Sequence, residues 1–345
     1  MAGDNPFHAG PGERPPALVG REAHLGVIGA ALAAARMPDD VPVVYSGRIL
    51  TGRTTLLDAA AEHTIADGWT TFQLAVHPGD DLGLALARVF EARTGAAMPR
   101  PEIRRVLRAI VQLLENEACP GVALFIDDID LAPIGQAAEL VDLLGQAMRN
   151  ELPVIAAVSC LPNWPDRLHL HLHRAGAANV LPTGLLAPAD VRAGVSGPAL
   201  AAGFRFDEPA LDALVRRCRG VPAFMQMLAS HASQSAIDGE VSEQTVVAAA
   251  LDAEHHAVTT FFQPIHDGLS PSQRRFLRAL RQAGEGAPFE AVRRHLGEFS
   301  RLEGGNSPAR MAMDELLQAG VIFTSGGDQL HFSVAAYGPF VDIVG

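Results

Sequence analysis

The stretch Gly47-Arg48-Ile49-Leu50-Thr51-Gly52-Arg53-Thr54 decides the fold of this 345-residue chain. It fits the pattern G-x-x-x-x-G-[K/R]-[ST], and it stands between a β-branched run at 41–46 and a helical pattern at 54–66, which is the context of a phosphate loop. Glycines let backbone N–H groups close around phosphate oxygens, and the positive end of the following helix points at the same oxygens. The alternative is a chance glycine turn. The residues predicted to hold the phosphates are Gly47, Gly52, Arg53, Thr54 and Thr55.

Position 53 carries arginine where the pattern usually carries lysine. Lysine is a compact point charge, whereas arginine is longer and planar, so the two are not interchangeable in a tight loop. The sequence contains no lysine, and all 27 basic residues are arginine, so the substitution fits a bias of the whole chain. We expect Arg53 to neutralise phosphate charge while crowding the loop. This degenerate loop predicts nucleotide binding with weak or absent hydrolysis.

A second motif is the apolar strand pattern at 122–126, which ends on Asp127 and Asp128. In P-loop enzymes one acid at such a strand end holds Mg²⁺ and another group positions the attacking water. The hydroxyl of Thr54 and the carboxylate of Asp127 are therefore the predicted Mg²⁺ ligands, and Asp128 and Arg53 are the predicted catalytic residues. Aspartate is one methylene shorter than the glutamate that is common at the second position, so its reach to the water is short. The alternative is an acidic cap on a strand end.

The order of elements predicts an α/β fold with a parallel sheet. Strand patterns at 41–46, 69–76, 122–126 and 154–159 alternate with helical patterns at 22–36, 54–66, 82–94, 103–117 and 137–149. Such alternation favours a parallel sheet with helices on both faces.

After about residue 185 the strand patterns vanish, and 187–235 indicates a small helical module. Three helical stretches then precede two apolar runs around the turn Gly326-Gly327-Asp328, which is typical of a winged helix. The predicted parts are an extended segment at 1–16, a P-loop domain at 17–186, a helical lid at 187–258 and a winged-helix domain at 259–345.

Taken in order, these motifs resemble the AAA+ ATPases that are common in actinobacteria and are related to archaeal-type ATPases, origin-recognition proteins and STAND regulators. The resemblance covers nearly the whole chain. Besides the phosphate loop and the double acid, it rests on Asn5-Pro6-Phe7, Leu18-Val19-Gly20-Arg21-Glu22, Leu152-Pro153-Val154, Ser159-Cys160-Leu161-Pro162, Gly220-Val221-Pro222 and Phe332-Ser333-Val334.

The resemblance implies roles for residues outside the loop. Ser159 stands where the family places a sensor of the γ-phosphate, and Pro222 stands where STAND proteins place a proline near the base. Val19 belongs to the same predicted cofactor-binding set. Cys160 departs from the glycine that is usual in the family. Arg174 either acts on the nucleotide of a neighbouring subunit or is a surface arginine.

The function that the resemblance implies is binding of ATP or ADP, with Mg²⁺, by a regulatory protein. The departures at Arg53, Asp128 and Cys160 weigh against hydrolysis more than against binding. We therefore predict a nucleotide-dependent switch in which nucleotide is held between core and lid. One alternative is an active ATPase that works on DNA through its winged helix, and another is a nucleotide-free scaffold. A protein partner is expected, and self-association stays open.

Charge weighs against DNA as the partner. The formal net charge is -12, so any contact with a phosphate backbone needs a local basic patch. The predicted third helix of the winged helix, 308–319, carries Arg310 but also two acids. Arg274, Arg275 and Arg278 on the first helix either touch a backbone or form a solvated face.

Three further observations concern the environment and metals. The cysteines Cys119, Cys160 and Cys218 are scattered and odd in number, which favours a reducing compartment. The chain shows neither a signal-peptide pattern nor an uncharged apolar run of about 18 residues, so we expect a cytoplasmic protein without a membrane span. His169, His171 and His173 would share one face of a strand and bind a metal only in that conformation, and a solvated face is the favoured interpretation.

Overall fold

The structure is a computed structural model that describes residues 4–8, 10, 12–116, 119–172, 178–297, 307–325 and 328–344. The chain divides into two compact units. The core unit consists of Gly20–Gly47 and Gly52–Gly184, and the C-terminal unit consists of Met1–Val19, Arg48–Thr51 and Leu185–Gly345. The division into four parts that the sequence predicts stays a prediction.

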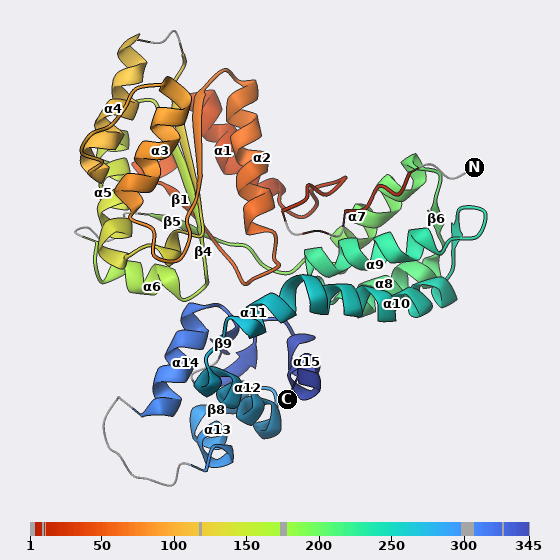
Figure 1. Cartoon of the computed structure of the whole chain (residues 1–345). Coiled ribbons are helices and arrows are strands. Elements are labelled where there is room, and N and C mark those ends of the chain that lie inside the picture. The colour runs from red at the N-terminus through yellow and green to blue at the C-terminus, as the bar shows by residue number, and fades with distance from the viewer. Residues whose placement is uncertain are drawn as a thin grey trace. The chain divides into compact units, whose positions relative to one another are not determined.

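A five-stranded parallel sheet forms the centre of the core unit (Figure 1). The order along the sheet is β2-β3-β4-β1-β5. Four of these strands were predicted, whereas the fifth was missed because it is short and ends on proline. The strands are β1 (Val43–Ser46), β2 (Thr70–Ala75), β3 (Val122–Asp127), β4 (Val154–Cys160) and β5 (Asn179–Pro182).

Helices cover both faces of this sheet, with α1 and α2 on one face and α3, α4 and α5 on the other (Figure 1). The side chains of β4 are buried along the whole strand, which explains why it reads as a continuous apolar run. The predicted α/β core is confirmed. Its helices are α1 (Glu22–Ala34), α2 (Arg53–Ala66), α3 (Leu82–Thr94), α4 (Ile103–Asn116), α5 (Ile134–Arg149) and α6 (Trp164–His169), with a short 3₁₀ turn, η2 (Ile129–Leu131).

The strand order brings the ends of β1, β3 and β4 to one edge of the sheet. β1 lies between β4 and β5, and the register pairs Tyr45 with Ser159 and Ser46 with Cys160. Because all pairings are parallel, the loop after β1 and the acids after β3 emerge at the same edge. Ligands of open α/β sheets bind at such carboxyl ends.

The C-terminal unit is largely helical. Its helices are α7 (Pro188–Ala201), α8 (Glu208–Cys218), α9 (Pro222–Gln234), α10 (Glu243–Ala257), α11 (Gln263–Asp267), α12 (Pro271–Ala283), α13 (Phe289–His295), α14 (Pro308–Gln318) and α15 (Tyr337–Val344), with a π-helical turn at Val258–Phe262. The last helix was not predicted, because its Gly338-Pro339 pair is typical of a helix breaker.

Short strands interrupt these helices. β6 (Arg205–Phe206) and β7 (Glu240–Val241) pair in parallel, so the expectation of a helical module without strands was wrong. Each of these two strands has only two residues, which are too few to show a period-two pattern in the sequence. β8 (Ala287–Pro288), β9 (Ile322–Ser325) and β10 (Gln329–Phe332) form an antiparallel sheet, which confirms the predicted hairpin after three helices. Gly326 and Gly327 of the predicted turn lie outside the described residues.

The N-terminal segment is attached to this unit through specific contacts. The side-chain amide of Asn5 donates to the carbonyl oxygen and the hydroxyl of Ser230 in α9, both at 3.0 Å. Phe7 is buried and packs edge-on against Phe206, with ring centroids 6.3 Å apart. The Asn5-Pro6-Phe7 motif therefore holds this segment onto the helices.

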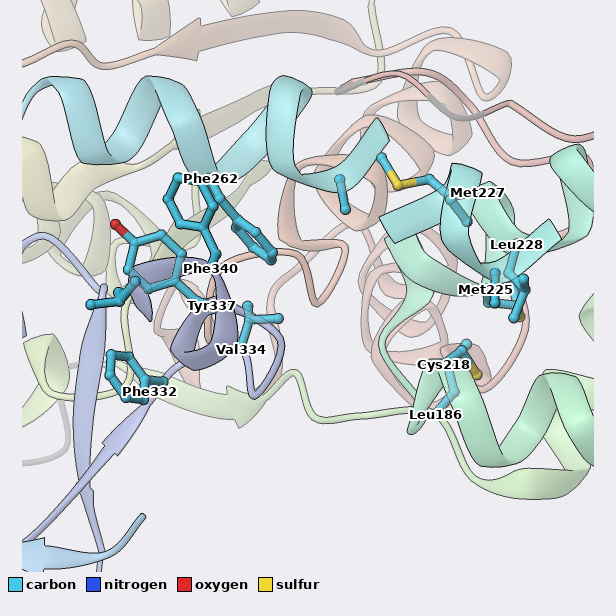
Figure 2. Close-up of a cluster of buried hydrophobic side chains, with 14 of the residues drawn as sticks. Leu186, Cys218, Met225, Met227, Leu228, Phe262, Phe332, Val334, Tyr337 and Phe340 are labelled. Carbon is cyan, nitrogen blue, oxygen red and sulfur yellow. The ribbon is translucent and has the colours of Figure 1, made fainter. Parts of the chain in front are cut away.

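An aromatic cluster joins the π-helical turn to α15 (Figure 2). The ring of Phe262 lies 5.2 Å from that of Tyr337 and 6.0 Å from that of Phe340, centroid to centroid. Phe224 of α9 packs edge-on against Phe262 at 6.0 Å. None of the helices in the described part of the chain is long and apolar enough to cross a membrane.

Candidate functional site

The start of α2 has the features of an anion site. Gly52 precedes the helix with φ 82°, a left-handed conformation, and it offers no side-chain cap. A β-carbon at this position would meet nothing within 4 Å, so the backbone angle rather than space requires glycine. The first N–H groups of a helix have no partner within it, so those of α2 are available to phosphate oxygens. The N–H of Gly47 donates to the carbonyl of Cys160 at 3.0 Å and fixes the beginning of the loop on β4.

Three predicted residues meet around one carboxylate. The hydroxyl of Thr54 donates to Oδ2 of Asp127 at 2.6 Å, and the hydroxyl of Ser159 donates to Oδ1 of the same carboxylate. The backbone N–H of Asp128 also donates to Oδ1, at 3.1 Å. Hydroxyl and carboxylate oxygens are the ligands that Mg²⁺ prefers. Among the described residues no group of three or more His, Cys, Asp or Glu side chains is arranged to hold a metal, so a Mg²⁺ ion here needs phosphate or water oxygens as well.

Arg53 and Asp128 pair with each other. Nη2 of Arg53 lies 2.7 Å from Oδ1 of Asp128, and the arginine side chain is only 11% exposed, against 38% for the aspartate. Asp128 has a left-handed backbone with φ 51°, and its N–H also lies 3.0 Å from the hydroxyl oxygen of Ser159. Burial raises the pKa of the Asp128 carboxyl, and the neighbouring Asp127 adds to this, whereas Arg53 opposes it. The two residues predicted to act on nucleotide thus neutralise each other.

A third acid, Asp130 of η2, belongs to the same cluster and was missed. Burial raises the pKa of its carboxyl to about 6, against the lowering effect of Arg53, and Asp128 contributes to the rise. The backbone amide of Leu161, just after β4, also lowers this pKa. The available signal was the run Asp127-Asp128-Ile129-Asp130, three acids in four residues after a buried strand.

Two predicted cofactor-binding residues, Val19 and Pro222, belong to the C-terminal unit. A β-carbon added to Gly194 of α7 would come within 2.9 Å of Val19 and 3.2 Å of Met225 in α9, so Val19 packs beside these helices. Pro222 begins α9, and Gly220 before it has φ 72° and approaches the backbone oxygen of Leu186. The contact of both residues with a base stays a prediction.

His169 and His171 do not lie on the strand that metal binding required. His169 is the last residue of α6, and Nδ1 of His171 lies 3.0 Å from the carbonyl oxygen of Arg167. His173 and Arg174 lie outside the described residues, and the predictions on them stay predictions.

The arginines considered for DNA mostly make internal contacts. Arg274 donates to the carbonyl oxygens of His266 and Asp267 at 3.1 and 2.9 Å. Arg275 donates to the carbonyl of Leu296 at 3.0 Å. Arg310 on α14 lies 3.5 Å from the carboxylate of Asp314.

Comparison with solved structures identifies the fold. The structure is similar to a Walker-type ATPase of Pyrococcus abyssi, with a TM-score of 0.64 and 12% identity over 95% of this chain and 97% of that chain. It is also similar to the ORC2 protein of Aeropyrum pernix in ADPNP–ADP complexes, with a TM-score of 0.58 and 16% identity over 96% and 95% of the two chains. The chain has the AAA+ ATPase fold. A third AAA+ structure, the Aeropyrum pernix ORC1 protein in complex with DNA, has a TM-score of 0.51 and 16% identity over 95% and 94%.

This likeness spans nearly the full length of both chains in each pair, so it includes the helical C-terminal region as well as the sheet. No protein-family model and no curated protein matches the sequence. At identities of 12 to 16% the likeness establishes the AAA+ fold, whereas the chemistry of the site depends on the residues of this chain.

Proposed function

We propose that this protein binds ATP or ADP as a nucleotide-dependent switch and hydrolyses ATP weakly or not at all. The observation that carries the proposal is the ion pair between Arg53 and Asp128. Phosphoryl transfer needs a cation on the transferred phosphate and a group that positions the attacking water. Here the cation is neutralised by the very carboxylate that would position the water, so both requirements are weakened together.

Nucleotide binding depends on other features, which remain in place. The glycine-preceded start of α2 offers backbone N–H groups, and Thr54 with Asp127 offers oxygens for a Mg²⁺ ion that would accompany the phosphates. Ser159 lies against Asp127, as a residue that senses the phosphates would. The similar ORC2 protein was solved in ADPNP–ADP complexes, which supports a nucleotide as the ligand.

An ATPase that acts on DNA is the second candidate, because the similar ORC1 protein was solved in complex with DNA. The internal contacts of Arg274, Arg275 and Arg310 and the acidity of the chain weigh against it. We propose a protein partner instead.

The test combines thermal denaturation with a phosphate-release assay. ADP and ATP should each raise the melting temperature, since a ligand at a hundred times its Kd stabilises by about 2.7 kcal/mol. Turnover should stay near background in the native protein. The double variant Arg53→Lys/Asp128→Glu should raise turnover about tenfold or more.

Glu139→Gln, which removes an exposed acid from α5 of the same unit, is the matched control and should change neither readout. Fast turnover by the native protein would establish the ATPase alternative. If neither nucleotide at millimolar concentration shifted the melting temperature, the protein would be the nucleotide-free scaffold.

A further inference from the structure

Two histidines on neighbouring helices of the C-terminal unit face each other. His231 lies in the last turn of α9 and His256 in the last turn of α10, and these helices pack side by side (Figure 1). Nε2 of His231 lies 3.1 Å from Nδ1 of His256. The ring planes are 86° apart, with centroids separated by 5.4 Å. Each helix therefore directs one ring nitrogen to the same small region between them.

The separation of these two nitrogens is close to that of two ligands of one metal ion. Imidazole nitrogens bind Zn²⁺ at about 2.0–2.1 Å, and the usual geometry is tetrahedral. With that length and angle, two nitrogens on one ion are about 3.3–3.4 Å apart. The observed pair therefore needs to open by only a few tenths of an ångström, with a rotation of the rings that turns both lone pairs toward the ion.

The pair is accessible to an ion and has the protonation state that metal binding needs. Both side chains are only partly buried, so an ion can reach them from solvent. Burial lowers the pKa of His231 and the neighbouring His256 lowers it further, whereas Asp252 raises it. The neutral imidazole, which is the form that binds metals, is therefore favoured near neutral pH. Asp252 lies one helical turn before His256 on the same face of α10, which places a negative charge close to the pair.

We propose that His231 and His256 bind a transition-metal ion, for which Zn²⁺ is the best match, and that this ion links α9 to α10. The two imidazoles are the protein ligands, and water completes the coordination. Structural zinc centres use four protein ligands, so a site with two holds an ion that exchanges with the solution. The proposed nucleotide site takes no part in this inference, which stands or falls independently of it.

Calorimetric titration of the nucleotide-free protein with Zn²⁺ at about pH 7.5, where imidazole is neutral, tests the site. His231→Gln and His256→Gln should each weaken Zn²⁺ binding about tenfold or more, because one of the two protein ligands is lost. His255→Gln is the matched control, since His255 is an exposed histidine next to the pair on α10. Its affinity for Zn²⁺ should equal that of the native protein. Equal affinities in the native protein, His231→Gln and His256→Gln would overturn the proposal.

A second measurement starts from the native protein and therefore gives a result even if a variant fails to fold. Cu²⁺ uses the same imidazole ligands as Zn²⁺, and its electron paramagnetic resonance spectrum reports the nitrogens bound to it. One equivalent of Cu²⁺ should show coupling to two imidazole nitrogens in the native protein and in His255→Gln, and an excess of Zn²⁺ should displace it. A native spectrum without two coupled imidazole nitrogens, or an unchanged spectrum in a folded His256→Gln variant, would overturn the proposal.

Discussion

The acid–arginine cluster of the core unit and the aromatic cluster of the C-terminal unit show two different uses of buried side chains. Around Arg53 and Asp128 the backbone at Asp128 is left-handed, and Nη1 of Arg53 and Oδ1 of Asp130 lack partners among the described residues. Around Phe262 the rings of Phe262, Tyr337 and Phe340 pack on one another (Figure 2). Nδ1 of His266 lies 3.3 Å from the hydroxyl of Tyr337. Proteins depart from favourable backbone geometry and complete hydrogen bonding mainly at functional sites. The first cluster therefore points to a ligand, and the second accounts for stability.

The largest expected effect comes from the aromatic cluster. Phe262→Ala should lower the free energy of unfolding by about 3–5 kcal/mol, because it removes a fully buried ring and leaves a cavity. Chemical denaturation measures this loss. The neighbouring Phe261, which is only partly buried, gives the control, and Phe261→Ala should cost clearly less. Equal losses at the two positions would mean that the cluster does not hold this unit together.

The second largest expected effect comes from removing the hydroxyl of Ser159. This hydroxyl donates to the carboxylate of Asp127 and accepts from the backbone N–H of Asp128. Ser159→Ala should lower the free energy of unfolding by about 2–3 kcal/mol, because it leaves buried polar groups without their hydrogen-bond partner. Thr183 of the same unit is buried too, and its hydroxyl has no partner in the described part of the chain, so Thr183→Val should be neutral or stabilising. If denaturation showed the two variants to be equally destabilised, the hydroxyl at 159 would have no special role.

A smaller effect concerns pH. The folded-state pKa of Asp130 is raised from 3.8 to about 6, so the folded state binds its proton more tightly than the unfolded state does. The resulting stabilisation is fully present below about pH 3.8 and is lost as the pH rises through about 6. Asp130→Asn should therefore flatten the curve of stability against pH in this window by about 1–2 kcal/mol. Superimposable curves for the native protein and the variant would contradict the raised pKa.

The smallest expected effect is on DNA binding. Replacing Arg274, Arg275 and Arg278 together by alanine should change DNA affinity little, because specific binding is not expected at physiological salt. A gel-shift titration with the native protein and the triple variant measures this. Submicromolar binding that falls in the variant would show that the C-terminal unit reads DNA and that the contacts of Arg274 and Arg275 are exchangeable.

The difference between local patterns and contacts over long sequence distances explains which features the sequence could predict. The loop at 47–54 and the strand that ends on Asp127 are local patterns, in which adjacent residues carry the signal, and both stand where they were predicted. The pairing of Arg53 with Asp128 joins residues far apart in the chain and depends on the sheet order, which no local pattern contains. Asp130 was missed for a related reason, since only its burial in the folded protein separates it from an ordinary surface acid.

In the C-terminal unit, packing rather than periodicity sets the elements that were missed. The strands β6 and β7 exist because two short segments lie side by side. In the helix α15 the Gly338-Pro339 pair lies in the first turn, where proline is tolerated, and Tyr337 and Phe340 of this helix pack on Phe262. Tertiary contacts overrule weak local preferences in such places.

The most direct test of the account is a calorimetric titration of the native protein with ADP and ATP, with and without Mg²⁺, followed by phosphate release from the ATP sample. We predict saturable binding of ADP to one site, and ATP that is recovered largely unhydrolysed. Absence of binding heat with both nucleotides, or ATP turnover well above background, would contradict it.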